Sequence, residues 1–153
     1  MGPVNRHSFL LRPLAVLALG FGCALAAAAD EVKVLAAGAF QPVVAAMAPA
    51  FAQRTGHKVL VVDGADGALA QRIRAGEEFD LAVLPQALLD ALGHEGAVAE
   101  GSIVPLARGA AATVYAGAVS ATAANSQAAL SLLILLASEE TQAVLKPSGL
   151  SAP

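Results

Sequence analysis

Hydrophobic residues along the chain alternate between short continuous runs and segments that repeat at three- and four-residue steps. The runs have the length of buried strands, and each ends in Gly or Pro: VKVLAAG (32–38), KVLVVDG (58–64) and FDLAVLP (79–85). Helical spacing of apolar residues follows each run, over 40–51, 65–73 and 88–92. We therefore predict alternating strands and helices, with three parallel strands, right-handed connections and helices covering the sheet.

Two residues in these stretches suit the starts of helices. Asp66 is predicted to be the N-cap of the second helix, because a carboxylate there accepts hydrogen bonds from exposed backbone N–H groups and complements the helix dipole. Pro85 suits the first position of the third helix, where its missing N–H costs nothing. Each strand is thus expected to lead directly into a helix.

The C-terminal part starts with two further strand candidates, SIVPLAR (102–108) and TVYAGAVS (113–120). Pro105 lacks a donor for a sheet ladder and predicts an edge or crossing strand. Asn125 can cap a helix that contains the run ALSLLILLA (129–137), which is apolar nearly all round. We expect this helix to be buried on several sides, since the run is about half as long as a membrane span needs. Ser138 is expected to cap a last short helix that Pro147 ends.

The first 29 residues are predicted to form a leader. Arg6 and Arg12 precede the apolar stretch LAVLALGFGCALAAAA (14–29), and the acidic pair Asp30–Glu31 follows. This order predicts a secretory signal peptide cleaved after Ala29, and hence a periplasmic protein. Two alternatives remain open: an uncleaved membrane anchor, and a lipoprotein acylated at Cys23. Cleavage after Ala29 would leave a mature chain without a thiol, because Cys23 is the single cysteine.

Charge and composition exclude several partners. The chain has 9 Lys and Arg against 12 Asp and Glu, and two of the nine lie in the leader. An acidic remainder without a basic cluster repels phosphate backbones, so nucleic acid is not an expected partner. No GxSxG, CxxC, HExxH or phosphate-loop motif is present, so we expect no catalytic residue, no metal ligand and no cofactor. A small hydrolase or transferase using His57 or His94 is the remaining enzymatic alternative.

Small residues stand where each predicted strand meets its helix. In a parallel sheet these places share the carboxyl edge, where ligands bind to open α/β sheets, and uncovered N–H groups there can hold a small oxyanion. The alternative is that small residues only permit tight turns. The candidate ligand-binding residues are Ala37, Gly38, Ala39, Phe40, Gly64, Ala65, Asp66, Gly67 and Leu84.

The amino-acid sequences of several segments resemble the first lobe of molybdate-binding-protein-like periplasmic solute receptors, which are the substrate-binding components of ABC transporters. They include VKVLAAGAFQPVVAAMAPAFAQRTGHKV, GADGALAQRIRAGEEFDLAVLP and GSIVPLARG, and the stretch 113–150 resembles the family's closing segment. The resemblance implies an α/β fold of three layers, a parallel-sheet lobe of a type 2 periplasmic binding protein with C-terminal helices packed on it.

The chain departs from this family in two ways. Where the family carries a second lobe, only Gly-Ala-Ala-Ala (109–112) joins the outgoing part (30–108) to the returning strand and helices (113–153). Residues 30–153 are thus expected to form one lobe. The resemblance also implies hydroxyl donors in the first two strand-to-helix turns, whereas neither turn here contains Ser or Thr. Asp66 adds a negative charge to the place where an oxyanion would lie.

These observations predict a non-enzymatic, exported solute-binding component of an ABC transporter. Its ligand would be a small molecule or an oxyanion such as molybdate, bound weakly because the second lobe is missing. The transporter permease is the expected protein partner, and contact with the membrane would occur only through the transporter or an uncleaved leader. The alternative is an exported interaction module that dimerises through the exposed half-cleft.

Overall fold

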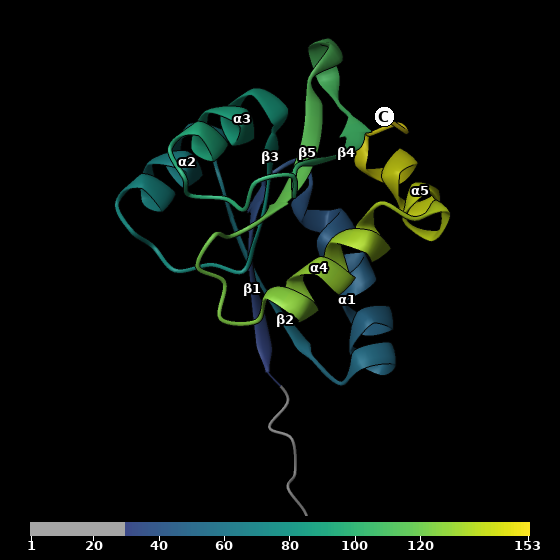
Figure 1. Ribbon diagram of the computed structural model, residues 1–153. Coiled ribbons are helices and arrows are strands. Elements are labelled where there is room, and N and C mark those ends of the chain that lie inside the picture. The colour runs from purple at the N-terminus through teal and green to yellow at the C-terminus, as the bar shows by residue number, and fades with distance from the viewer. Residues whose placement is uncertain (1–29) are drawn as a thin grey trace, which may run out of the picture.

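A five-stranded sheet in the order β2-β1-β3-β5-β4 forms the centre of the computed structural model, which describes residues 30–153 (Figure 1). The predicted signal peptide and Cys23 lie outside the described residues. The strands are β1 (Glu31–Ala37), β2 (Lys58–Gly64), β3 (Leu81–Pro85), β4 (Val104–Arg108) and β5 (Val114–Val119). The helices are α1 (Gln41–Thr55), α2 (Asp66–Arg74), α3 (Gln86–His94), α4 (Ser126–Leu136) and α5 (Glu139–Leu145), with short 3-10 turns at Ala110–Ala112 and Lys146–Ser148.

The first three strands are parallel, as the sequence predicts. Val32 pairs with Val59, and Val34 pairs with Leu81. The sheet as a whole is mixed, however, because β5 runs antiparallel to β3 and β4 runs antiparallel to β5. The antiparallel β5 lies beyond the three strands that the sequence predicts to be parallel, and β4 points in the same direction as β1, β2 and β3.

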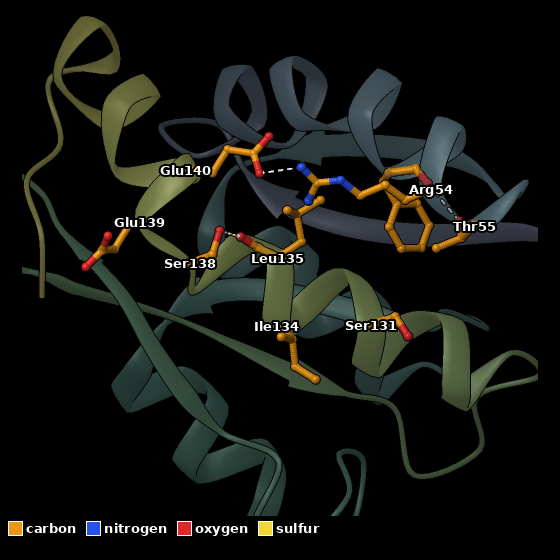
Figure 2. Close-up of a pocket in the computed structure, with 9 residues that line it drawn as sticks. Arg54, Thr55, Ser131, Ile134, Leu135, Ser138, Glu139 and Glu140 are labelled. Atoms are coloured by element: carbon orange, nitrogen blue, oxygen red, sulfur yellow. Dashed lines mark hydrogen bonds and ion pairs between the residues drawn. The ribbon is translucent and has the colours of Figure 1, made fainter.

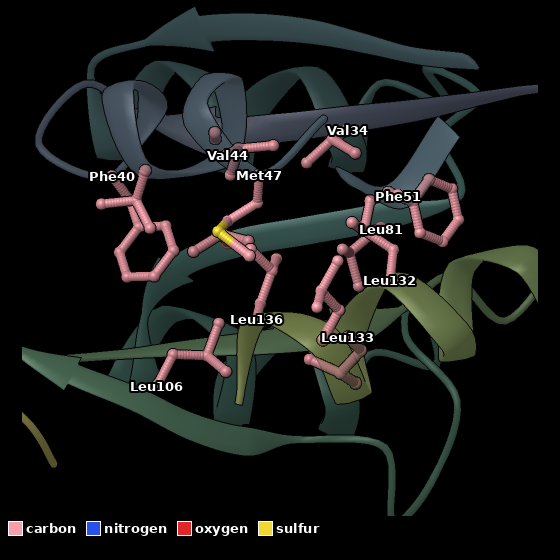
Figure 3. Packing of buried hydrophobic residues seen from close by; sticks show 14 of the residues in the cluster. Val34, Phe40, Val44, Met47, Phe51, Leu81, Leu106, Leu132, Leu133 and Leu136 are labelled. Atoms are coloured by element: carbon pink, nitrogen blue, oxygen red, sulfur yellow. The ribbon is translucent and has the colours of Figure 1, made fainter. Parts of the chain in front are cut away.

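Helices cover both faces of the sheet and make a three-layer α/β fold. Figure 1 shows α2 and α3 on one face, and α1, α4 and α5 on the other. The larger core lies under α1 and α4, where Met47 and Phe51 pack with Leu132 and Leu136 (Figure 3). Alternate residues of β1 pack into the two cores, since Val34 belongs to the larger core and Leu35 to the smaller one.

The expected burial of the run 129–137 is only partly correct. Leu132 and Leu133 are buried, but Leu130 is 45% exposed and Ile134 is 63% exposed. The physical reason is that α4 lies in an outer layer, so one of its sides contacts the sheet and another faces solvent. Within residues 30–153 no single helix is long and apolar enough to cross a membrane, and α4 passes that test only together with Glu139–Ser148, at a bend of 64°.

Asn125 and Ser138 occupy the predicted N-cap positions, but their side chains bind elsewhere. The Asn125 amide donates to the carbonyl oxygen of Glu31 at 3.2 Å, and the Ser138 hydroxyl donates to that of Leu135 at 2.6 Å. The predicted boundaries are therefore confirmed, while the expected capping hydrogen bonds are not. Pro147 falls in the 3-10 turn that directly follows α5.

A tight hairpin joins β4 to β5 at residues 109–113. The N–H of Gly109 donates to the carbonyl oxygen of Thr113 at 2.8 Å, and the N–H of Thr113 donates to that of Ala110 at 3.1 Å. Ala111 and Ala112 have φ values of 52° and 59°, a left-handed conformation that alanine adopts only at a cost. Pro105 lies in the edge strand β4, as predicted, next to an irregularity between Pro105 and Ala107.

Candidate functional site

The tips of β1, β2 and β3 and the starts of α1, α2 and α3 lie together at one edge of the sheet, which we call the carboxyl edge. Parallel pairing places the three tips there, as the sequence predicts. Gly38 and Gly64 show how close the first two tips are, because the N–H of Gly38 donates to the carbonyl oxygen of Gly64 at 3.2 Å. The edge therefore brings the predicted candidate residues into one region.

In the first turn, only two of the four candidate residues meet solvent. Ala37 and Phe40 are fully buried, whereas Gly38 and Ala39 are exposed. The N–H of Phe40 donates to the carbonyl oxygen of Ala37 at 2.7 Å and closes the turn. A ligand at this turn would therefore meet Gly38 and Ala39, while the ring of Phe40 supports the turn from the core.

The second turn corrects the prediction for Asp66. Ala65 takes the N-cap position in an extended conformation, Asp66 is the first residue of α2, and its side chain makes no capping hydrogen bond. The capping prediction fails because the chain enters the helix one residue earlier than expected. Among residues 30–153, no hydrogen bond or ion pair in the structure involves the half-buried Asp66 carboxylate. Gly64 is half-buried and Gly67 is exposed beside it.

At the third tip the last candidate residue, Leu84, is fully buried in the smaller core. Only its backbone is thus left to contact a ligand at this edge. Pro85 occupies the N-cap of α3 instead of the predicted first helical position, a difference of one residue. A hollow of about 430 Å³ opens next to it, lined by Pro85, Gln86, Ala87, Asp90, Thr113 and Val114.

Tyr115 also belongs to the carboxyl edge, and sequence reasoning missed it. Because β5 is antiparallel, the start of this strand lies at the tip of β3, where Tyr115 pairs with Pro85. Its ring centroid is 6.3 Å from that of Phe40. Burial, and secondarily the negative charge of Asp66, raise the pKa of Tyr115, so the phenol stays protonated and can donate a hydrogen bond. Tyr115 is the single tyrosine of the chain, and this was the only feature of the sequence that could have singled it out. Its position at the carboxyl edge could be assigned only once the direction of β5 was known.

Arg108 is the second residue that sequence reasoning left out. It ends β4, which points in the same direction as the three parallel strands, so it lies at the carboxyl edge beside β5. None of the ion pairs formed within residues 30–153 involves Arg108. The edge therefore combines Arg108, the carboxylates of Asp66 and Asp90, and three helix starts. The N–H groups and dipoles of the helix starts favour negative charge.

A second groove, of about 400 Å³, lies between α1, α4 and α5. Phe51, Ile134 and Leu135 provide its apolar lining, and the ion pair of Arg54 with Glu140, 2.6 Å long, crosses one side (Figure 2). Because α1 starts at the carboxyl edge and runs away from it, Phe51 and Arg54 near its end lie far from the strand tips. This groove contains none of the predicted ligand-binding residues.

Residues 30–153 contain two histidines, His57 and His94, which do not lie together. His57 precedes β2 at the opposite edge, where its ring stacks on Phe51 at 6.4 Å and its Nδ1 is buried without a partner in the described part of the chain. It is thus less solvated than an ordinary turn residue. His94 ends α3 and is exposed. Residues 30–153 contain no group of three His, Cys, Asp or Glu side chains that could hold a metal ion.

The family model for bacterial extracellular solute-binding proteins matches residues 32–114, more than half of the chain. This chain belongs to that family. The match begins in β1 and includes β2, β3 and β4, so it covers all three strand tips. No curated protein matches the sequence.

Solved structures of solute-binding proteins share the fold. The substrate-binding domain of a putative molybdenum ABC transporter from Clostridium difficile is 14% identical with a TM-score of 0.73, over 81% of this chain and 99% of that one. The periplasmic molybdate-binding protein of Azotobacter vinelandii is 14% identical with a TM-score of 0.72, over 80% and 100%. The sulfate-binding protein SubI of Mycobacterium tuberculosis is 12% identical with a TM-score of 0.68, over 80% and 87%.

Proposed function

We propose that this solute-binding protein is the exported, periplasmic binding component of an ABC transporter, and that its carboxyl edge forms one wall of the ligand site. The observation that carries the proposal is the convergence of three helix starts at the strand tips, of which the first two are joined by the Gly38–Gly64 hydrogen bond. Exposed N–H groups at such helix starts are suited to a small oxyanion. The names of the similar proteins, which bind molybdate or sulfate, support the same ligand class.

The proposal includes weak binding by a single lobe. Two-lobed binding proteins gain affinity when the lobes close on the ligand and remove it from water. Here the short hairpin at 109–112 occupies the point where the family resemblance places a second lobe. One wall supplies only part of the contacts, so we expect dissociation constants above the micromolar range. The protein would bind its ligand without chemical conversion and would deliver it to a permease.

The test is a titration of residues 30–153, followed by ¹H–¹⁵N NMR, with molybdate, tungstate, sulfate and phosphate. We expect saturable shifts of the Gly38, Gly64 and Gly67 amides at millimolar anion. An Ala39→Trp variant should abolish the shifts by covering the edge, whereas Ala137→Trp, at an exposed position beyond α4, should not.

Two results would contradict the proposal. Unchanged spectra with all four anions would exclude an oxyanion site at the carboxyl edge, and submicromolar affinity would exclude weak single-lobe binding. Sedimentation of the same samples should give a monomer, because the proposed site needs no second copy.

A further inference from the structure

We propose that, in the full-length chain, the apolar stretch of the predicted leader (14–29) packs on the groove between α1, α4 and α5, which we call the helical groove. This surface lies far from the carboxyl edge, so its occupant is independent of any ligand bound there. Three features carry the inference: an uncovered apolar surface, the place where the leader joins the fold, and the charges of the two partners.

The helical groove continues into an apolar stripe on the outer side of α4 (Figure 2). Ile134 lines the groove and is 63% exposed, and Leu130, one turn before it, is 45% exposed. Residues 121–138 carry no charged side chain, so no charge interrupts this surface along the helix. Contiguous exposed apolar surface of this kind is typical of a place where another apolar segment binds.

The leader joins the fold directly beside this surface. Asp30, the first residue after the leader, lines a hollow of about 200 Å³ together with His57 and residues 124–128 at the start of α4. The ring of His57 stacks on that of Phe51, which lines the helical groove, with centroids 6.4 Å apart. A segment that ends at Asp30 therefore has the helical groove as the next surface along α4.

The apolar stretch is long enough to cover the stripe. The 16 residues of 14–29 directly precede Asp30, with no polar linker between them. In a helical conformation they would span about 24 Å, and in an extended one more than that. The 11 residues of α4 span about 17 Å. In either conformation, the stretch reaches from Asp30 past the end of α4.

The charges of the leader and of the helical groove are complementary. The leader carries Arg6 and Arg12 and no acidic residue. Glu139 lines the groove where α5 begins, and none of the ion pairs within residues 30–153 involves it. A leader that runs from Asp30 along α4 brings Arg12 towards Glu139. Opposite charges on two surfaces favour the orientation that brings them together.

The single cysteine allows a test on the unsubstituted chain. Cys23 lies inside the apolar stretch, so a nitroxide attached to it labels the leader alone. In ¹H–¹⁵N spectra of the uncleaved full-length chain, we expect the nitroxide to broaden the amide signals of Thr55, Ile134 and Leu135, which line the groove. Chemical reduction of the nitroxide should restore these signals. A leader that packs elsewhere would broaden only the signals beside its junction at Asp30.

Two substitutions of exposed apolar residues provide a matched comparison. Ile134→Asp places a charge in the apolar surface and should remove most of the broadening at Thr55 and Leu135. Leu60→Asp makes the same kind of change on β2, at a position that is 42% exposed and does not line the groove, and should leave the broadening unchanged. Signals that match the wild type elsewhere show that each variant keeps the fold.

Several results would overturn the inference. These are broadening confined to residues beside Asp30, or equal broadening in Ile134→Asp and in the wild type. In a mixture of nitroxide-labelled chain and unlabelled ¹⁵N chain, broadening at Ile134 would assign the groove to the leader of a second copy. A full-length chain recovered only with phosphatidylglycerol vesicles would show that the leader prefers lipid. None of these results affects the anion titration of residues 30–153, so the proposed function is tested separately.

Discussion

Gly38 and Gly64 join the tips of β1 and β2 through a hydrogen bond of 3.2 Å between the N–H of the first and the carbonyl oxygen of the second. The two glycines differ in the space around them. A Cβ at Gly38 would meet only the Gly64 oxygen, at 3.9 Å, whereas a Cβ at Gly64 would lie 3.1 Å from a methyl carbon of Leu69. The first turn can therefore accept a side chain that the second cannot.

Gly38→Ser should increase oxyanion affinity without loss of stability. The added hydroxyl supplies a donor that the first turn lacks, and a hydrogen bond to a charged group contributes about 1.5 kcal/mol, or roughly tenfold in affinity. NMR titration measures the affinity, and urea unfolding should stay within about 0.5 kcal/mol of wild type. Gly64→Ala is the comparison, with an expected loss of about 1 kcal/mol from crowding against Leu69. Equal losses in both variants would contradict this difference between the tips.

Replacing Ala111 or Ala112 by glycine should stabilise the protein. Both alanines have positive φ, and relief of the steric cost exceeds the larger entropy that glycine loses on folding. We expect a gain of about 0.5 kcal/mol at each position in urea unfolding. Ala110→Gly serves as the control, because Ala110 is not among the residues with positive φ and should show no gain. A loss of stability in Ala111→Gly would show that the hairpin is not strained.

Asp80→Ala should destabilise the fold by about 3 kcal/mol. The buried carboxylate accepts from the N–H of Lys33 at 2.9 Å and from that of Asn125 at 3.0 Å, so it ties β1 and the start of α4 to the start of β3. Its removal leaves both N–H groups without a partner. Asp80→Asn keeps one acceptor oxygen and should lose about half as much. A loss below 1 kcal/mol for the alanine variant in urea unfolding would be inconsistent with this role.

Glu77 should contribute stability that disappears in acid. Its hydrogen bond with Arg72, and then that with Lys33, lower the pKa of Glu77 from 4.5 to about 2. A carboxyl whose pKa is lower in the folded protein stabilises it fully above the ordinary value. That contribution is lost as the pH falls from about 4.5 to about 2.

The urea midpoint measured at steps across this pH range tests the contribution of Glu77. Glu77→Gln should flatten the acid dependence, whereas Glu78→Gln, at the exposed neighbouring position, should not. An identical pH profile in wild type and Glu77→Gln would rule out the ion pairs of Glu77 as the source of the acid dependence of stability.

The amino-acid sequence is enough to predict the strand and helix segments and the shared edge of the first three strands. The run 32–38 is apolar on both faces, and it folds as a parallel strand covered by helices. The similar run 58–64 also forms a parallel strand, but the prediction that it is buried is wrong, because β2 lies at the edge of the sheet and Leu60 is 42% exposed. Glycines at the strand ends then located the turns where Gly38 and Gly64 meet. These features depend on local composition and period, which a single sequence displays directly.

The groups that lie at that edge depend on tertiary contacts that the sequence does not display. Strand direction is a property of pairing, so the antiparallel course of β5 placed Tyr115 beside Pro85, and β4 brought Arg108 to the same edge. The side chains of Phe40 and Leu84 are fully buried in the core, so they do not face the edge. A shift of one residue at the start of α2 gave the cap to Ala65 and left the carboxylate of Asp66 at the strand tips, because helix boundaries depend on how the chain leaves the sheet.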